Sequence, residues 1–187
     1  MAQNDAAVNL GTTGQIAIAA VGSTPPSDLS AAITTPWKVI GHTSLDNLPS
    51  WTEDGGDQST IGTWQSPSLR NVQTKAATYQ MTFASDQLDS QSFALYYGVP
   101  NTVTTAGKFD VFAPGNVEFA LLVIIQDGDS YVGFHASRAS FTRSDDISLA
   151  TDKFTELPIQ ASFLTYTDDG VTAPLFSWLS SVFTVTS

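Results

Sequence analysis

The sequence predicts a mainly β protein: a sandwich or barrel of two antiparallel sheets with one flanking α-helix and extended loops or arms. Three observations lead to this fold class. Short segments of alternating or continuous apolar character recur along the 187 residues, turn signals rich in Gly, Asp and Pro separate them, and only one segment has a helical period. With 42% hydrophobic and 13% charged residues, the chain is expected to form a single globular domain over residues 1–187.

The N-terminal third is predicted to hold an arm and two strands. Residues 1–15 are small and polar, with too little apolar surface to fold alone, and are expected to form an N-terminal arm. A first strand is expected over residues 15–21. A second is expected over residues 37–42, opened by Pro36 at a position that tolerates proline.

Residues 48–70 are predicted to form a long hairpin that reverses at an acidic, glycine-rich tip. Adjacent glycines permit the positive φ that a tight reversal needs. Two interpretations of this tip stay open: a solvated turn, or a loop that becomes ordered against a neighbouring molecule. The tip consists of Glu53, Asp54, Gly55, Gly56 and Asp57.

A strand and the helix follow this hairpin. Residues 78–83 alternate between polar and apolar side chains, which is typical of a half-buried strand. Ser85 or Asp86 then provides a helix cap, and the helix is expected over residues 86–97. Gly98 ends it, since glycine readily adopts the left-handed conformation after a helix.

The predicted helix has a wider apolar face than one sheet needs. Leu88, Leu95 and Tyr96 form one arc with Ser92, while Phe93 and Tyr97 extend it sideways. This excess favours either a wide core contact or a contact of Phe93 and Tyr97 with another subunit.

The C-terminal half is predicted to form the core hairpin and the last strands. Residues 117–126 are almost entirely apolar, which indicates burial on both faces in the middle of a sheet. Residues 131–142 return as the antiparallel partner after the turn Asp127-Gly128-Asp129. Further strands are expected over the segments 108–112, 157–167 and 176–185, with a turn at 168–170.

Composition excludes several classes of function. Seven basic against eighteen acidic residues give a net charge of −11 and a pI near 4.1, which argues against binding nucleic acid through its phosphates. The absence of cysteine excludes disulfides and thiolate metal sites. The longest purely apolar run, residues 119–125, is far shorter than the ~20 residues of a membrane helix. No basic residue precedes Lys38, so no secretory signal is expected.

No catalytic, cofactor-binding or metal-binding motif is present in the sequence. His42 and His135 have no second histidine or cysteine at ligand spacing, which favours structural roles. The segment 127–129 begins like a calcium loop but lacks the later oxygen ligands. The pairs Asp145-Asp146 and Asp168-Asp169 are expected to be solvated turn carboxylates. We therefore expect a protein that is not an enzyme and needs no metal or cofactor.

Several short stretches, taken in order, resemble the major tail proteins, or tail tube subunits, of long non-contractile-tailed bacteriophages, especially those that infect actinobacteria. They extend from about residue 37 to residue 165, and each is weakly specific alone. The stretches are Trp37 with Ile40-Gly41-His42-Thr43-Ser44, Asp54-Gly55-Gly56-Asp57, Gly62-Thr63-Trp64-Gln65, Leu69-Arg70, Leu95-Tyr96-Tyr97-Gly98, and Arg143-Ser144-Asp145-Asp146-Ile147-Ser148-Leu149.

This resemblance implies a two-sheet sandwich with a flanking helix, six copies in a ring, and rings stacked into a tube. It implies the tape measure protein as a partner inside the tube, later replaced by DNA that passes without specific binding. Tail tip and tail terminator proteins are the partners at the ends of the tube. The protein is expected in the virion tail and, during assembly, in the host cytoplasm. No additional C-terminal immunoglobulin-like domain of the kind some relatives carry is seen.

Two other functions remain open from the sequence. A non-enzymatic β-sandwich module for carbohydrate would use Trp51, Trp64 and Trp178 as a stacking platform. An acid/base hydrolase would need the fold to bring two of the turn carboxylates together.

Overall fold

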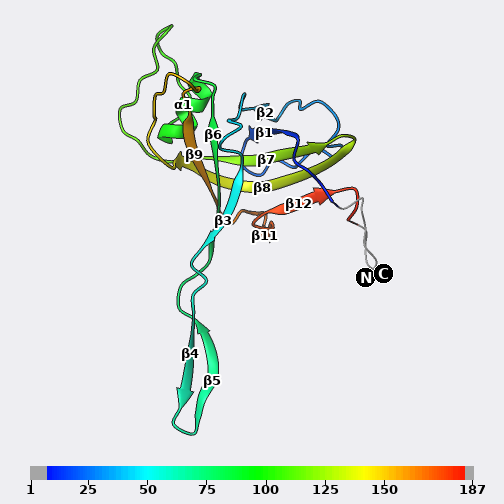
Figure 1. Cartoon of the computed structure of the whole chain (residues 1–187), viewed down its shortest axis with the longest axis vertical. Helices are drawn as coiled ribbons and strands as arrows, with labels where there is room; N and C mark the ends of the chain where they lie inside the picture. Colours follow the sequence, from blue (N-terminus) through cyan, green and yellow to red (C-terminus); the bar gives the residue numbers. More distant parts are fainter. Residues whose placement is uncertain (1–7, 184–187) are drawn as a thin grey trace.

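The computed structural model describes residues 8–183. It shows a β-rich body from which one hairpin extends far outward (Figure 1). The single helix is α1 (Ser90–Tyr97). The strands, in chain order, are β1 (Thr13–Ala19), β2 (Lys38–Val39), β3 (Ser50–Asp54), β4 (Gln58–Thr63), β5 (Ser66–Gln73), β6 (Thr78–Ser85), β7 (Val117–Asp127), β8 (Ser130–Arg143), β9 (Leu157–Phe163), β10 (Thr167–Asp168), β11 (Val171–Thr172) and β12 (Ser177–Ser180).

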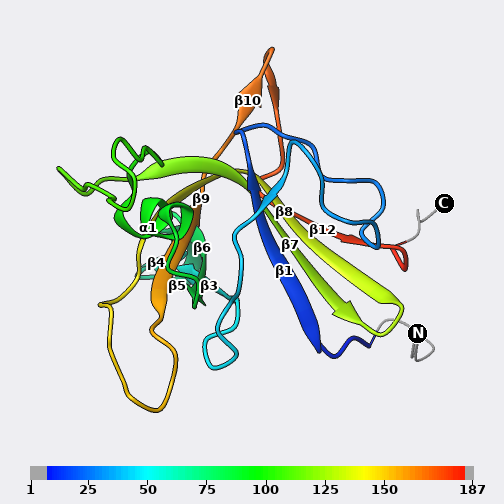
Figure 2. The ribbon, with the colours of Figure 1, turned by 90° about the horizontal axis from the view of Figure 1, so that it is seen from above.

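One antiparallel sheet forms the body. Its strands follow the order β2-β1-β7-β8-β9-β6-β3, and β12 adds to β8. The long strand β8 pairs with β12 through residues 132–135 and with β9 through residues 139–143. Between these halves its register with β7 shifts, which is how a bulge bends a strand. The bent path places β1, β7, β8 and β12 on one side of the body, and β6 and β9 with α1 on the other (Figure 2).

The expected class, mainly β and antiparallel with one flanking helix, is confirmed. The described strands form no closed barrel, and the two layers expected of a sandwich are the two halves of one bent sheet. The core lies inside the bend, where Phe134, Phe141 and Leu95 are completely buried. Strand β7 is buried on both faces, as its apolar run predicts. Leu121 and Val123 point into the main core, whereas Leu122 belongs to a second cluster with Trp37.

The helix begins later than expected. Its N-cap is Asp89, whose carboxylate accepts a hydrogen bond from the backbone N–H of Ser92 at 2.8 Å. Ser85 and Asp86, the expected caps, are not used because Ser85 still belongs to β6, where it pairs with Leu157 of β9. The expected C-terminal end is confirmed, since Gly98 has a φ of 63° and its N–H bonds back to the last turn.

Other expected elements differ in extent. Residues 108–112 form no strand and contribute only the bridge between Thr105 and Lys108. The second strand is reduced to Lys38–Val39. Residues 13–15 of the expected N-terminal arm already belong to β1, while its residues 1–7 lie outside the described part. The last strand ends at Ser180, and residues 184–185 of the expected strand lie outside the described part.

Candidate assembly interface

The expected hairpin over 48–70 exists in a different form. Strand β3 pairs with β6, from Ser50 opposite Thr82 to Asp54 opposite Thr78, and not with the segment around Ile61. The chain then enters a separate two-stranded ribbon in which β4 pairs with β5. The reversal lies at Trp64 and Gln65, between Thr63 and Ser66. The prediction that residues 53–57 form the tip is therefore wrong.

Residues 53–57 form the neck of this ribbon. The N–H of Gly56 donates to the Lys75 carbonyl at 3.2 Å, and the N–H of Thr74 donates to the Asp57 carbonyl at 2.8 Å. Asp54 forms an exposed ion pair with Lys75 at 3.1 Å. These contacts join the two segments of the chain where they leave the body.

Glycine is required at position 55 of this neck. Gly55 has a φ of 86° and Gly56 a φ of 71°, both in the left-handed region. A Cβ on Gly55 would lie 2.4 Å from the carbonyl oxygen of Ala76. The turn signal read from the sequence is thus real, but it sets the direction of the ribbon and does not reverse the chain.

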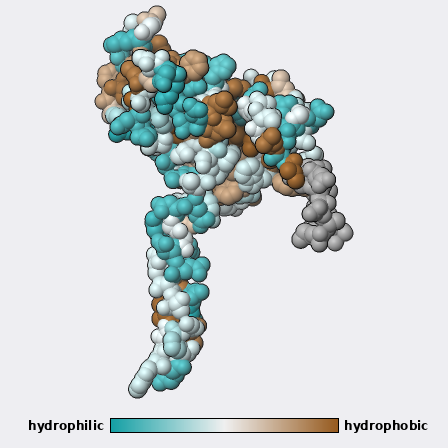
Figure 3. Space-filling view, viewed as in Figure 1, coloured by the Kyte–Doolittle hydropathy of each residue, from teal (hydrophilic) through white to brown (hydrophobic). Residues whose placement is uncertain are grey.

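The ribbon has no buried face within one chain. Every residue of β4 is exposed, and Ser66 alone in β5 is partly covered. The exposed fractions are 55% for Ile61, 96% for Trp64 and 64% for Leu69. Figure 3 shows this projection as a mostly hydrophilic surface interrupted by hydrophobic patches. An isolated two-stranded hairpin is marginally stable in water, so this shape favours a partner that covers it.

An aromatic cluster supports the body beside the ribbon. Trp51 of β3 lies 5.2 Å from Trp178 of β12 and 5.3 Å from Phe134, measured between ring centroids. Phe134 also contacts Phe163 and Phe176. The strand that leads into the ribbon is therefore anchored in the core by its own tryptophan.

This arrangement contradicts the three-tryptophan carbohydrate platform. Trp51 and Trp178 pack against each other at an interplanar angle of 51°, so they do not present coplanar faces. Trp64 lies at the end of the ribbon, away from the body (Figure 1).

The wide helix face is partly occupied within the chain. Phe93 stacks on Tyr97 at 6.4 Å and on Phe109 at 6.0 Å, and both Phe93 and Tyr97 pack half-buried against the core. Phe109 belongs to the loop between α1 and β7, where Phe112 is 96% exposed. The outer parts of this stack remain accessible to another molecule.

The candidate catalytic residues are not brought together. His135 is buried, and its Nε2 lies 2.9 Å from the Ser23 carbonyl oxygen, while His42 is exposed. Asp145 and Asp146 line a groove beside β6, whereas the Asp168-Asp169 pair belongs to the β10–β11 hairpin.

Within residues 8–183, no three His, Cys, Asp or Glu side chains are grouped as a metal site would require. Over the same residues, no helix has the length and apolar character to cross a membrane.

The exposed apolar residues of the ribbon were not predicted from the sequence as assembly contacts. Ile61 on β4, Trp64 at the reversal and Leu69 on β5 are exposed apolar residues with many polar neighbours. The available signal was the β-branched content of Thr60, Ile61 and Thr63, which favours a strand beyond the glycines.

Comparison with known proteins agrees with a structural role. The sequence profile of the family described as "Phage tail tube protein" matches residues 1–186. The chain is 37% identical over 191 residues to the protein named "Major tail protein Gp23" of Mycobacterium phage D29, covering 96% of this chain and 94% of that protein. The same values hold for "Major tail protein Gp23" of Mycobacterium phage L5. A match over nearly the whole chain, to a family of tail tube proteins and to two relatives named major tail proteins, shows that this chain belongs to the phage tail tube protein family and is a component of the virion tail.

Proposed function

We propose that this tail tube subunit assembles into rings of six copies, that the rings stack into a tube, and that the lumen conducts DNA during ejection. The observation that carries the proposal is the β4–β5 ribbon. A subunit that exposes both faces of a two-stranded ribbon gains stability when a neighbouring copy covers them. The family relationship supports another tail tube subunit as that neighbour.

Electron microscopy of the purified, concentrated protein tests this assembly directly. Rings or tubes with sixfold top views are expected, together with a mass in solution that is a multiple of the 19.9 kDa chain. A protein that remains monomeric at every concentration, with no rings on the grid, would contradict the proposal.

We propose that the neck residues Glu53, Asp54, Gly55, Gly56 and Asp57 act with the ribbon in the contact between rings. The neck is acidic and glycine-rich, and it directs the ribbon away from the body (Figure 1). The bond between Thr74 and Asp57 allows a clean test, because a two-glycine bridge replacing residues 58–73 would join chain positions that already lie side by side. This variant should fold and stay soluble but fail to extend tubes. Normal tube growth would contradict a role for the ribbon.

We propose Phe93 and Tyr97 as contacts between subunits within a ring. Their stack with Phe109 lies on the outside of α1 and is only half covered by the chain itself. Interfaces favour aromatic residues because they bury a large area at low entropic cost.

The proposed partners in the lumen are the tape measure protein and then DNA, while tail tip and terminator proteins bind the ends. The net charge of −11 supports passage of DNA without specific binding, since phosphates are repelled by a surface of the same sign. Retention of double-stranded DNA by assembled tubes at low salt would contradict this passive role.

A further inference from the structure

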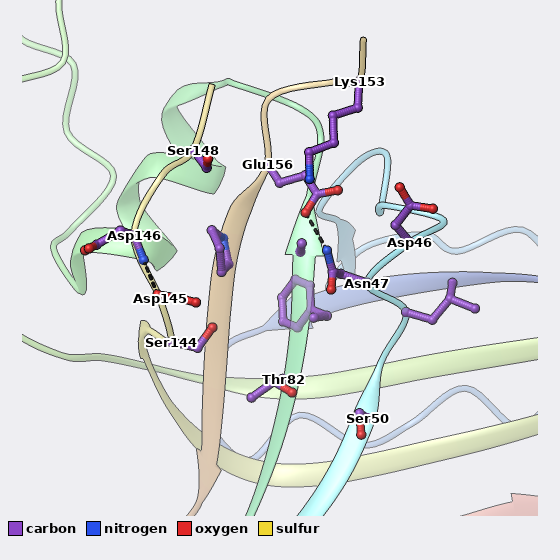
Figure 4. Close-up of a pocket in the computed structure, with 14 residues that line it drawn as sticks. Asp46, Asn47, Ser50, Thr82, Ser144, Asp145, Asp146, Ser148, Lys153 and Glu156 are labelled. Carbon is purple, nitrogen blue, oxygen red and sulfur yellow. Dashed lines mark hydrogen bonds between the residues drawn. The ribbon is translucent and has the colours of Figure 1, made fainter. Parts of the chain in front are cut away.

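A groove of about 560 Å³ lies at the opposite end of β3 and β6 from the ribbon. The ribbon leaves the sheet where Asp54 pairs with Thr78, whereas the groove begins where Ser50 pairs with Thr82. Its floor is formed by Thr82, Phe83 and Ala84 with Pro158 of β9. One wall is the turn at residues 46–48, and the other is the loop that connects β8 to β9 (Figure 4).

The walls of this groove are held in place before any partner binds. The Glu156 carboxylate accepts a hydrogen bond from the Ser44 hydroxyl at 2.8 Å and another from the Asn47 side-chain amide. The loop that carries Glu156 is held a second time, because the Tyr96 hydroxyl of α1 donates to the Asp145 carbonyl at 2.9 Å. A preformed groove loses less conformational entropy on binding than a flexible one does.

The groove is strongly acidic. Asp46, Asp145, Asp146 and Glu156 contribute four carboxylates and Lys153 one ammonium, which leaves a net charge of 4 − 1 = 3 negative units. Several negative charges that share one concave surface favour a cationic partner, because the field is concentrated there. The chemistry of the groove therefore favours a segment that carries a basic side chain and no acidic one.

The ribbon of another copy has this chemistry. Arg70 is the only charged side chain in residues 58–73, so the ribbon is cationic in a chain whose net charge is −11. Arg70 pairs with Ile61 across the strands, so the two side chains project on the same face in the middle of the ribbon. The ribbon points away from the groove of its own chain, so intramolecular binding is excluded (Figure 1).

We propose that the acidic groove receives the β4–β5 ribbon from a second copy of this chain. Arg70 then faces Asp145 and Asp146, while Ile61, on the same face of the ribbon, covers Leu48, an exposed apolar residue of the groove. This inference rests on the proposed tube and specifies its acceptor surface. Because donor and acceptor are different surfaces of the chain, the contact is heterologous and can repeat from copy to copy.

Charge reversal tests the pairing, with the critical concentration for tube assembly as the readout. Arg70→Glu should raise that concentration about tenfold or more, as expected when one partner of an interfacial charge pair is reversed. Lys153→Glu is the matched control, because it changes the net charge by the same two units but makes the groove more acidic. Lys153→Glu should assemble at the wild-type concentration or below it. If both variants impair assembly equally, the effect comes from the change in net charge and the proposal is overturned.

Rescue by the reciprocal change identifies the partner residues. In the triple variant Arg70→Glu, Asp145→Arg, Asp146→Arg, the opposite charges face each other again, so assembly should recover most of the loss. All variants are first compared with wild type by thermal unfolding, which separates a folding defect from a docking defect. A folded triple variant that assembles no better than Arg70→Glu alone would exclude Asp145 and Asp146 as the acceptor.

Cross-linking supplies a second test, because the chain has no cysteine. A chain carrying Gln65→Cys at the ribbon tip and Ser148→Cys in the groove should give a ladder of covalent multimers with a short bismaleimide. A chain carrying Gln65→Cys and Val171→Cys, whose position on β11 is 72% exposed, should not. Tubes that form normally but give no ladder specific to the groove would overturn the acceptor assignment and leave the tube intact. Absence of wild-type tubes would instead refute the proposed function.

Discussion

Trp51 on β3 packs against Trp178 on β12, with ring centroids 5.2 Å apart. The two strands do not pair with each other, since β3 lies at the end of the sheet path and β12 is attached to β8. Their tryptophans therefore connect the two sides of the bent sheet through side chains alone. This contact stabilises the strand from which the ribbon projects.

Truncating a core aromatic should lower the stability of the monomer strongly, whereas truncating the ribbon tryptophan should leave it almost unchanged. Phe134 is completely buried in the cluster with Trp51 and Trp178, so Phe134→Ala should lower the free energy of unfolding by about 3–5 kcal/mol. Trp64 is 96% exposed, so Trp64→Ala should change it by no more than about 0.5 kcal/mol. Chemical denaturation of the monomer measures both values. Assembly should be lost in Trp64→Ala although its stability is unchanged; a large stability loss there would place Trp64 in the fold instead.

Loss of the helix cap should have a moderate cost. Asp89 accepts from the Ser92 N–H at 2.8 Å and also from the side-chain amide of Gln87 at 2.7 Å. Asp89→Ala should destabilise the protein by about 1 kcal/mol, whereas Asp89→Asn, which keeps a capping oxygen, should cost less. Thermal unfolding of the two variants provides the comparison. Equal losses would show that charge, and not capping, accounts for the effect.

Removing the charge of Asp86 should stabilise the protein at neutral pH. Burial raises the pKa of this carboxyl above its ordinary value of 3.8, and the negative charges of Glu156 and Asp46 raise it further, while His42 opposes them. The folded state then binds the proton more tightly than the unfolded state, so stability falls as pH rises from 3.8 through the folded pKa. Asp86→Asn should be more stable than wild type above this window and equal to it below pH 3.8. A gain that persists at lower pH would not come from this ionisation.

His135 should make the protein sensitive to mild acid. Burial lowers the pKa of its imidazole below the ordinary 6.5, although the backbone bond with Ser23 partly opposes the shift. The folded state binds the proton less tightly than the unfolded state, so stability is complete above pH 6.5 and is lost as pH falls through the folded pKa. His135→Gln, which retains an N–H donor, should flatten the unfolding free energy over this window. An unchanged pH profile would assign the acid sensitivity to other groups.

Changing both outer aromatics of α1 to serine should affect assembly more than folding. Phe93 and Tyr97 are half-buried, so some stability will be lost, but an interface aromatic often contributes ~2 kcal/mol or more to binding. Analytical ultracentrifugation should show fewer rings from Phe93→Ser, Tyr97→Ser while circular dichroism still shows a folded monomer. Loss of the folded monomer in step with the rings would make this face part of the core.

Local signals predicted the elements whose causes are local. Gly98 ends the helix as expected because its left-handed conformation is a property of glycine itself. The start of the helix was misplaced because three residues in that region favour caps, and pairing of Ser85 with Leu157, which lies 72 positions further along the chain, decided between them. Where a local cap and a long-range strand partner compete for the same residue, the sequence alone did not predict the start of the helix.

The ribbon shows the same competition on a larger scale. Gly55-Gly56 is a stronger turn signal than Trp64-Gln65, yet β3 pairs with β6 across the base and leaves the glycines as a neck. The acidic groove had no local signal, since Asp46 precedes β3 whereas Asp145 and Glu156 lie in the loop between β8 and β9, and only the folded sheet brings these two segments together.

The two positive-φ glycines lie where the ribbon joins the body, so a small rotation there moves the far end of the ribbon by a larger distance. Strand β4 has six residues, so at ~3.3 Å per residue its far end lies roughly 20 Å from Asp57. A rotation of about 10° at the neck therefore moves Trp64 by roughly 3 Å without disturbing any core contact. In a filament that curves, copies on the outer side lie further apart than those on the inner side. A ribbon that rotates at its neck accommodates this difference in spacing, so the subunit body itself need not deform when the filament bends.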